Sequence, residues 1–132
     1  EKMHLKIITH EKVVFDEDVD AIYTRGTDGD FGVLKGHIPV MAALDIGVTR
    51  VVQDGQDQSF ATMGGVFQFK DDEALILTNT AECGDEIDEA RAKEALMRAQ
   101  ARLMEKEAGM DAKRAEAAMA RAMARLKATL NK

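Results

Sequence analysis

The composition of the chain changes abruptly near Gly84, and this break limits the possible folds more than any other feature. Residues 1–85 contain 22 valine, isoleucine or threonine residues, whereas residues 86–132 contain only Ile87 and Thr129. The second part instead has 14 alanines and a single glycine. β-branched residues favour strands and alanine favours helix. The sequence therefore predicts an α+β protein with a β domain over residues 1–85 and a helical arm over residues 86–132.

The charge divides at the same point. The first part has 7 basic and 16 acidic side chains and the second has 11 basic and 8 acidic, which together give the net charge of −6. An acidic chain in which only 5% of the residues are aromatic is not expected to bind nucleic acid.

Within residues 1–85, short segments of alternating apolar and polar residues are separated by turn residues. The expected strands are 5–9, 19–24, 48–52, 59–63 and 75–80. The expected turns are 27–30, 53–56 and 70–73, of which the first two contain Asp-Gly, a strong hairpin signal. The pair Gly64-Gly65 predicts a bulge or a tight turn. Many short strands without intervening helices favour an antiparallel sandwich or barrel.

The arm is expected to form an antiparallel helical hairpin. Asp85 followed by Asp88 resembles a helix cap with an acidic first turn, and Asp111, after a break at Gly109, is expected to cap a second helix. Apolar residues recur every three or four positions in both segments, at Ala92, Leu96, Ala99 and Leu103 and at Ala112, Ala115, Met119, Ala122 and Leu126. Because this seam is mostly alanine, it buries little apolar area. The hairpin is therefore expected to be weakly held and to open without melting.

Several classes of protein are not supported by the sequence. The apolar runs are far shorter than the roughly 20 residues of a membrane span, and residues 1–6 alternate like a strand rather than forming a signal peptide. Cys83, the only cysteine, is expected to fill the core in a reducing compartment. The three histidines, His4, His10 and His37, lack metal-ligand spacing, and no catalytic motif is present. Neither a metal site nor an enzyme is predicted.

Residues 32–39 combine two glycines with the only proline of the chain and are expected to form a constrained turn that presents His37. Residues 41–47 and 60–67 follow, with the sequences M-A-A-L-D-I-G and F-A-T-M-G-G-V-F. In this order the three segments resemble the epsilon subunit of rotary F-type ATP synthases, called delta in mitochondria. The resemblance covers essentially the whole chain, although Lys35 stands where the family often has proline. It implies a flattened β-sandwich for the β domain.

One candidate ligand site follows from the geometry of the arm. Asp88 and Arg91 share a face at the start of the first helix, and Arg121 and Arg125 share a face near the end of the second. In an antiparallel hairpin these ends lie close together, so three guanidinium groups are expected to converge on a patch suited to phosphate. The alternative is purely local, with Asp88 stabilising the first helical turn and pairing with Arg91.

The same residues are similar to the nucleotide motif of bacterial epsilon subunits, Ile/Leu-Asp-x-x-Arg-Ala, with arginines on the second helix. The resemblance implies ATP as a regulatory ligand and no required cofactor. The implied ATP-binding residues are Glu82, Ile87, Asp88, Arg91, Ala92, Arg121 and Arg125.

The resemblance also implies protein partners. Asp30 and His37 would face the c-ring, the sandwich would dock on the gamma subunit, and the arm would extend towards the alpha and beta subunits. The alternative for His37 is a hydrogen bond within its own turn. The basic residues of the second helix, alternatively a solvated face, are Lys113, Arg114, Arg121, Arg125 and Lys127.

These features favour a non-catalytic rotor subunit of a proton- or sodium-driven ATP synthase, whose arm senses ATP and restrains ATP hydrolysis. Its expected location is peripheral, on the cytoplasmic face of a bacterial cell membrane, with a plastid thylakoid left open. The membrane would be reached only through the complex. The competing interpretation is a stand-alone nucleotide-sensing or protein-interaction module of the same architecture.

Overall fold

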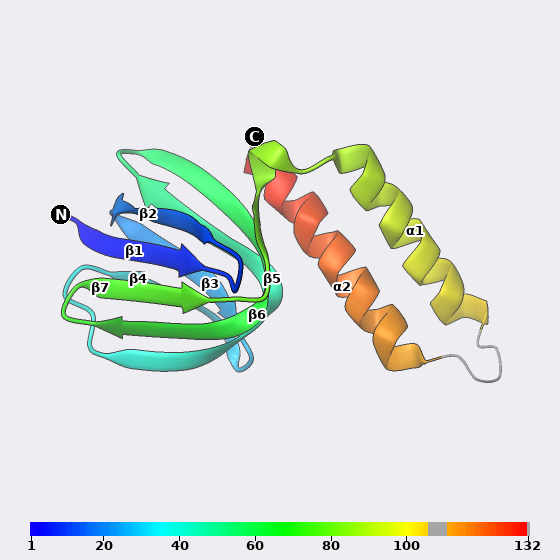
Figure 1. The fold of residues 1–132 in the computed structure, drawn as a ribbon, viewed down its shortest axis with the longest axis horizontal. Helices are drawn as coiled ribbons and strands as arrows, with labels where there is room; N and C mark the ends of the chain where they lie inside the picture. The colour runs from blue at the N-terminus through cyan, green and yellow to red at the C-terminus, as the bar shows by residue number, and fades with distance from the viewer. Residues whose placement is uncertain (106–110, 132) are drawn as a thin grey trace.

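The computed structural model describes residues 1–105 and 111–131 and consists of a strand-rich body followed by two helices (Figure 1). The strands are β1 (Met3–Ile8), β2 (Val13–Val19), β3 (Ala21–Gly26), β4 (Gly29–Leu34), β5 (Val40–Gln53), β6 (Gln56–Lys70), β7 (Glu73–Leu77) and β8 (Ala81–Cys83). The helices are the short 3-10 helix η1 (Gly84–Glu86), α1 (Glu89–Glu105), α2 (Ala112–Ala128) and the 3-10 helix η2 (Thr129–Asn131). The predicted α+β class, with an N-terminal sandwich and a C-terminal hairpin, is confirmed.

The strands form one continuous hydrogen-bonded sheet in the order β2-β1-β7-β6-β5-β3-β4, with β8 paired to β6. Figure 1 shows this sheet folded into two layers, with β5 and β6 curving round at the end nearest the helices. All of its pairs are antiparallel except that of β1 with β7, which is parallel. The two long strands therefore connect the layers and carry the surface on which the arm packs.

Aromatic side chains fill the space between the layers. Phe15 and Phe60 meet edge to face with their ring centroids 5.6 Å apart, and Phe31 and Phe67 do the same at 5.4 Å. Such edge-to-face pairs add to the free energy gained by burying the rings. Cys83 is buried in this same core, as predicted.

The predicted hairpin turns are present. Asp54-Gly55 joins β5 to β6 with φ angles of 52° and 78°, and Asp71-Asp72 joins β6 to β7 with φ angles of 51° and 60°. Two successive positive φ angles match the right-handed twist of the flanking strands, which explains why Asp and Gly occupy these positions.

Two predictions about strands are wrong. The expected strand 19–24 is divided at Asp20, whose carboxylate accepts a hydrogen bond from the backbone N–H of Asp54 at 2.7 Å and so ties this point to a neighbouring turn. The segment 32–39 is not wholly a turn, because its first three residues belong to β4. Gly32 serves the strand, since a Cβ there would overlap the ring of Tyr23 on the paired strand β3.

The pair Gly64-Gly65 produces a kink inside β6. Both residues have positive φ angles, 75° and 124°, but the pairing of β6 with β5 keeps the same register on both sides. No extra residue is inserted and the strand does not end, so the prediction of a bulge or tight turn is wrong. The kink needs glycine because a Cβ on Gly65 would overlap the backbone carbonyl of Leu77.

The arm has the predicted helical seam and the predicted cap at Asp111, but the cap predicted at Asp85 is wrong, because Asp85 lies in η1 and Asp88 directly precedes α1. Asp111 caps α2 by accepting a hydrogen bond from the backbone N–H of Arg114, and Asp88 accepts one from Arg91 at the start of α1. The buried seam residues are alanines, Ala92 and Ala99 from α1 and Ala115 and Ala122 from α2. The predicted break at Gly109 lies outside the described residues.

Helix α2 lies between α1 and the sandwich (Figure 1). Its second buried face contains Ala124 and Ala128, which join Ala61 and Met63 of β6 and Ile87 in one apolar cluster. The helix therefore packs on two sides, whereas the sequence predicts only the seam with α1.

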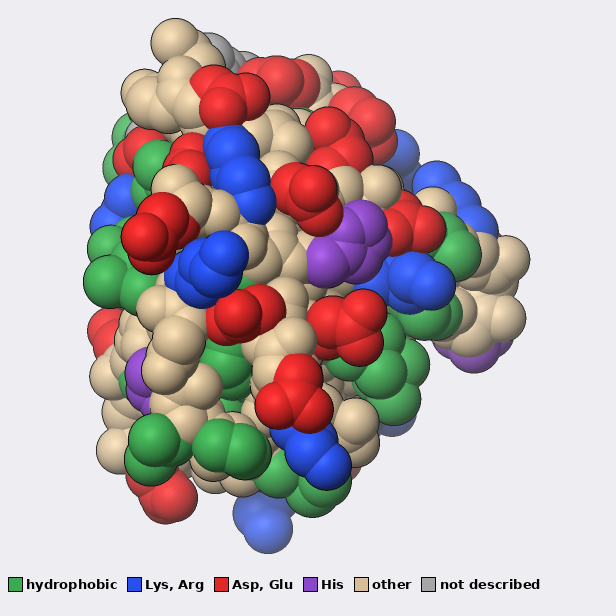
Figure 2. All heavy atoms as spheres, turned by 90° about the vertical axis from the view of Figure 1, so that its left-hand side faces the viewer, with side chains coloured by type: hydrophobic (Ala, Val, Ile, Leu, Met, Phe, Trp, Pro, Cys, Tyr) green, Lys and Arg blue, Asp and Glu red, His purple; other side chains and the backbone are tan. Residues whose placement is uncertain are grey.

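Acidic side chains predominate over much of the face turned away from the helices (Figure 2). Within the described residues, no helix combines the length and the apolar character that crossing a bilayer requires.

The kink in β6 gives a prediction about stability. Gly29 has nearly the same φ as Gly65, 127° against 124°, but a Cβ on Gly29 would meet no atom within 4 Å. Gly29→Ala should therefore lower the free energy of unfolding only by the cost of holding alanine at a positive φ, about 1–3 kcal/mol. Gly65→Ala should lower it clearly more, because the chain must also move away from β7. Chemical denaturation of both variants measures the difference, and equal losses would contradict this account of the kink.

Candidate functional site

The candidate ligand site lies where β8, the start of α1 and the end of α2 meet. Glu82 of β8 and Arg125 of α2 form an ion pair, with the Arg125 Nε donating to Glu82 Oε1 at 2.8 Å. Both side chains are about one-third exposed. The structure thus brings together two of the predicted ATP-binding residues that are 43 positions apart in the sequence.

The apolar members of the predicted motif hold the helix ends together. Ile87 and Ala92 are buried in one cluster with Ala124 and Ala128, so the first turn of α1 lies beside the last turns of α2. The expected convergence of the two helix ends therefore occurs.

The polar members of the motif are arranged around this cluster. Asp88 is exposed and its carboxylate caps α1 by accepting the backbone N–H of Arg91, so its contact is local, although Asp88 precedes the first turn and does not pair with the Arg91 side chain. Arg91 is exposed and Arg121 is half-buried. Among the described residues neither side chain forms an ion pair, and Arg91 pairs through its backbone N–H rather than its guanidinium group. Of the three predicted guanidinium groups, that of Arg125 is held at the junction by Glu82.

A close backbone contact fixes the end of α2 at this junction. Gly84 is buried in η1, and a Cβ there would overlap the carbonyl oxygen of Ala128. Only glycine permits this approach, so α2 ends directly against the residue that begins the connection to α1. The sequence places Gly84 at the domain boundary but gives no sign of this contact.

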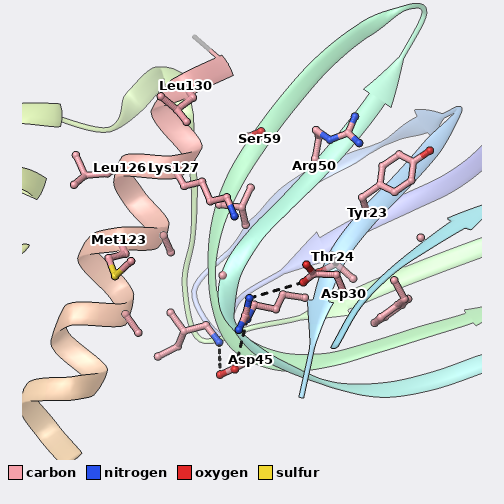
Figure 3. Close-up of a pocket in the computed structure, with 18 of the residues that line it drawn as sticks. Tyr23, Thr24, Asp30, Asp45, Arg50, Ser59, Met123, Leu126, Lys127 and Leu130 are labelled. Atoms are coloured by element: carbon pink, nitrogen blue, oxygen red, sulfur yellow. Dashed lines mark hydrogen bonds and ion pairs between the residues drawn. The ribbon is translucent and has the colours of Figure 1, made fainter. Parts of the chain in front are cut away.

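A groove of about 1180 Å³ lies on another side of α2, between that helix and the strands β3, β4 and β5 (Figure 3). Its apolar side is formed by helix residues such as Met123, Leu126 and Leu130, with Lys127 beside them. The sheet side is charged and includes Arg25, whose guanidinium group lies 4.0 Å from Asp30 and 3.7 Å from Asp45.

None of the predicted ATP-binding residues lines this groove. Sequence reasoning missed it because its two walls come from segments far apart in the sequence, and no pattern in either segment shows that they face each other. Arg50 also belongs to the groove and lies over the ring of Tyr23, 4.3 Å from the ring centroid. The groove is therefore amphipathic, with an apolar helical wall opposite charged strand residues.

The two predicted c-ring residues lie towards opposite ends of β4. Asp30 is near its start with an exposed side chain, and His37 follows its end. The imidazole of His37 contacts the backbone carbonyl of Ile38 through Nδ1 at 2.7 Å and packs edge to face on Phe69. The hydrogen bond expected by the alternative interpretation is thus present, and the side chain is nevertheless exposed.

Comparison with protein families gives two matches that together cover nearly the whole chain. Residues 2–84 match the model for the ATP synthase, Delta/Epsilon chain, beta-sandwich domain. Residues 85–129 match the model for the ATP synthase, Delta/Epsilon chain, long alpha-helix domain.

Two similar proteins are both described as ATP synthase epsilon chains. The ATP synthase epsilon chain of Desulforamulus reducens is 43% identical over 124 residues, covering 94% of both chains. The ATP synthase epsilon chain of Symbiobacterium thermophilum is 44% identical over 127 residues, covering 96% of this chain and 91% of that protein.

Two solved structures contain a chain with a fold similar to that of this protein. A chain in the cryo-EM structure of the Euglena gracilis mitochondrial ATP synthase, OSCP/F1/c-ring in rotational state 1, matches with a TM-score of 0.85 and 26% identity, over 98% of this chain and 81% of that one. A chain of the Tetrahymena thermophila mitochondrial ATP synthase central stalk/c-ring structure has a TM-score of 0.62 at 14% identity, covering 98% of this chain and 97% of that one, which supports the fold alone.

The contact at Gly84 predicts how the arm is held against the sandwich. Gly84→Ala should force the end of α2 away from η1, because the added Cβ overlaps the carbonyl of Ala128. Hydrogen exchange should then accelerate in the last turns of α2 and remain unchanged in β1. Glu86→Ala is the matched control, since Glu86 is exposed in the same short helix. Unchanged exchange in the glycine variant would show that this contact does not hold the arm.

Proposed function

The chain belongs to the ATP synthase delta/epsilon family, and on this premise we propose that it is a non-catalytic rotor subunit that couples the gamma subunit to the c-ring. The observation that carries this proposal is the pair of adjacent family matches over residues 2–84 and 85–129, because they reproduce both the sandwich and the helical arm in one chain. The similarity to a chain of the Euglena F1/c-ring assembly supports the same assignment.

The sandwich is the part proposed to bind the neighbouring rotor subunits. Its exposed loop with His37, together with Asp30, is the proposed contact for the c-ring, since polar side chains at loop ends suit the polar loops of a partner. The loop is held in place for this role, because the Gly36 backbone N–H donates to the Asp72 carboxylate at 2.7 Å. Through these contacts the chain would lie at the cytoplasmic face of the membrane as a peripheral subunit.

The arm is the part proposed to regulate ATP hydrolysis. Helix α2 and the residues after it, from Asp111 onward, carry six basic against two acidic side chains. Its packing against α1 and β6 is made largely by alanines, which bury little area per residue. An extended arm would exchange this packing for contacts with gamma and with acidic surfaces of the alpha and beta subunits, and so restrain rotation in the hydrolysis direction.

ATP is the proposed regulatory ligand of the closed arm. Its phosphates would bind Arg91, Arg121 and Arg125, with Glu82 and Asp88 accepting hydrogen bonds from the rest of the nucleotide. A ligand that binds only the closed arm stabilises it by RT ln(1 + [L]/Kd), about 2.7 kcal/mol at a hundredfold excess over Kd. Inhibition should therefore deepen as the ATP concentration falls.

A stand-alone sensor or interaction module of the same architecture is the alternative function. It would need the ligand site but not the loop with His37 or the rotor contacts. Association with the other ATP synthase subunits separates the two functions.

The proposed rotor function is tested by purifying a tagged chain from detergent-solubilised membranes, both complete and lacking residues 109–132. Each form should recover the alpha, beta and gamma subunits, because the sandwich is retained. The complex with the shortened chain should hydrolyse ATP faster while ATP synthesis is largely unchanged.

Either readout can fail separately. Recovery of neither complex would favour the stand-alone module. Equal hydrolysis by the two complexes at both low and high ATP would show that the arm is not the brake.

ATP binding is tested by calorimetry on the isolated chain. Arg91→Ala should weaken binding about ten- to hundredfold, since a hydrogen bond to a charged group contributes about 1.5–3 kcal/mol. Arg102→Ala is the matched control, because this exposed arginine lies in the last turn of the same helix, away from the junction. No heat and no change in Tm at millimolar ATP would exclude the ligand and leave the rotor function untouched.

A further inference from the structure

Three cations in and just before β1 face three carboxylates in and just after the edge strand β2. Lys2, His4 and Lys6 alternate along the outer face of the first strand, because the residues between them, Met3 and Leu5, point into the core. The opposing carboxylates also alternate, at Asp20, Asp18 and Asp16. These six side chains are called the charge ladder below.

The ladder consists of two groups of contacts, Lys2 with Asp20, and His4 and Lys6 with Asp16 and Asp18. Lys2 Nζ lies 3.0 Å from Asp20 Oδ2, and Lys6 Nζ lies 4.0 Å from Asp16 Oδ2. Between them, His4 Nδ1 lies 2.8 Å from Asp18 Oδ1 and Nε2 lies 2.5 Å from Asp16 Oδ1. Opposite charges on neighbouring strands stabilise the pairing of those strands, and like charges left unpaired weaken it.

The contacts of His4 require a specific protonation state. A neutral imidazole has one N–H group and so can donate to only one of the two carboxylates, whereas an imidazolium ion donates to both. Ionised carboxylates accept hydrogen bonds but cannot donate them. The ladder as it stands is therefore complete only when His4 is protonated.

The other charged groups near His4 are of both signs. Glu73 of β7 is paired in register with His4 on the side opposite β2, and its side chain is exposed on the same outer face. The backbone carbonyl of Asp72 accepts the N–H of His4. The cations are Lys2 and Lys6, each two positions away along the chain. Lys2 pairs with Asp54 and Asp20, and Lys6 lies 4.0 Å from Asp16, which His4 also contacts.

We propose that His4 is a pH sensor that fastens the edge strand β2 to the sandwich while it is protonated and loosens it when the proton is lost. Deprotonation leaves one of Asp16 and Asp18 without its N–H donor on His4 and removes the positive charge between them, so the two carboxylates then repel each other along β2. This property is separate from the proposed rotor function and does not depend on it.

The contacts of His4 determine whether the attachment of β2 strengthens or weakens as the pH rises. Hydrogen bonds to Asp18 and Asp16 raise the pKa of His4 above its ordinary value of 6.5. A raised pKa means that the stabilisation is complete below the pKa of the unfolded chain and is lost as the pH rises through the higher pKa of the folded chain. The outer pair responds elsewhere. Hydrogen bonds to the carboxylates of Asp54 and Asp20 raise the pKa of Lys2 above 10.5, and hydrogen bonds from the Asp54 backbone N–H and from Lys2 lower the pKa of Asp20 below 3.8. Within the ladder, His4 is thus the member that responds near neutral pH.

The first test is a titration of the histidine resonances by NMR on the complete, unmodified chain. His4 should titrate with a pKa above 6.5. A value at or below 6.5 would overturn the proposal, whatever the behaviour of any variant.

The second test measures hydrogen exchange of the β2 amides between about pH 6 and about pH 9, corrected for the intrinsic pH dependence of exchange. Protection should fall as the pH rises in the unmodified chain. It should be low throughout in His4→Gln and high throughout in His4→Lys, which keeps a positive charge over this range. His10→Gln is the control, since His10 is exposed and contacts only the adjacent Glu11 among the ion pairs of the described residues. A pH dependence of β2 that is the same in His4→Gln as in the unmodified chain would refute the sensor.

Discussion

The packing of α2 against the strands β5 and β6 is the contact on which the position of the whole arm depends. Among the described residues, the outer helix α1 packs mainly on α2, so α2 is what places it beside the sandwich. The contact is close because the facing residues are small: alanines on the helix, and Gly84 beneath the last turn. The convergence of Ile87, Glu82 and Arg125 at one junction follows from this position of α2 and would be lost without it.

Charge is organised differently in the two parts of the chain. On the sandwich, cations are few and most are paired across strands, as in the charge ladder and in the pair of Arg50 with Asp57 at 2.9 Å. On the arm, the excess of basic residues has few acidic partners, and Arg125 finds its partner on the sandwich rather than on a helix. This cross-domain pair is exposed enough to be screened by solvent, so it orients the helix more than it stabilises it.

Patterns that act locally could be predicted from the sequence. The break in composition at Gly84, the cap at Asp111 and the turn at Asp54-Gly55 each depend on neighbouring residues, and all of them are found. Most contacts between distant segments could not be predicted, which is why β4, the kink in β6 and the groove beside α2 were missed or misread. The charge ladder is intermediate, because the alternation of cations over residues 2–6 and of carboxylates over residues 16–20 is visible in the sequence but their register is not.

The two-sided packing of α2 limits how the arm can open. If the hairpin swings away as a unit, the contacts with β6 and Gly84 are lost but the seam with α1 is kept. If α2 leaves alone, both of its faces are exposed and the free-energy cost is larger. A ligand at the junction of Glu82, Arg91 and Arg125 would touch the sandwich and both helices, and would therefore oppose either movement. Its effect on the arm is limited by the difference between its affinities for the closed and open states, so a site that bridges all three elements is the arrangement in which one small ligand has the greatest control.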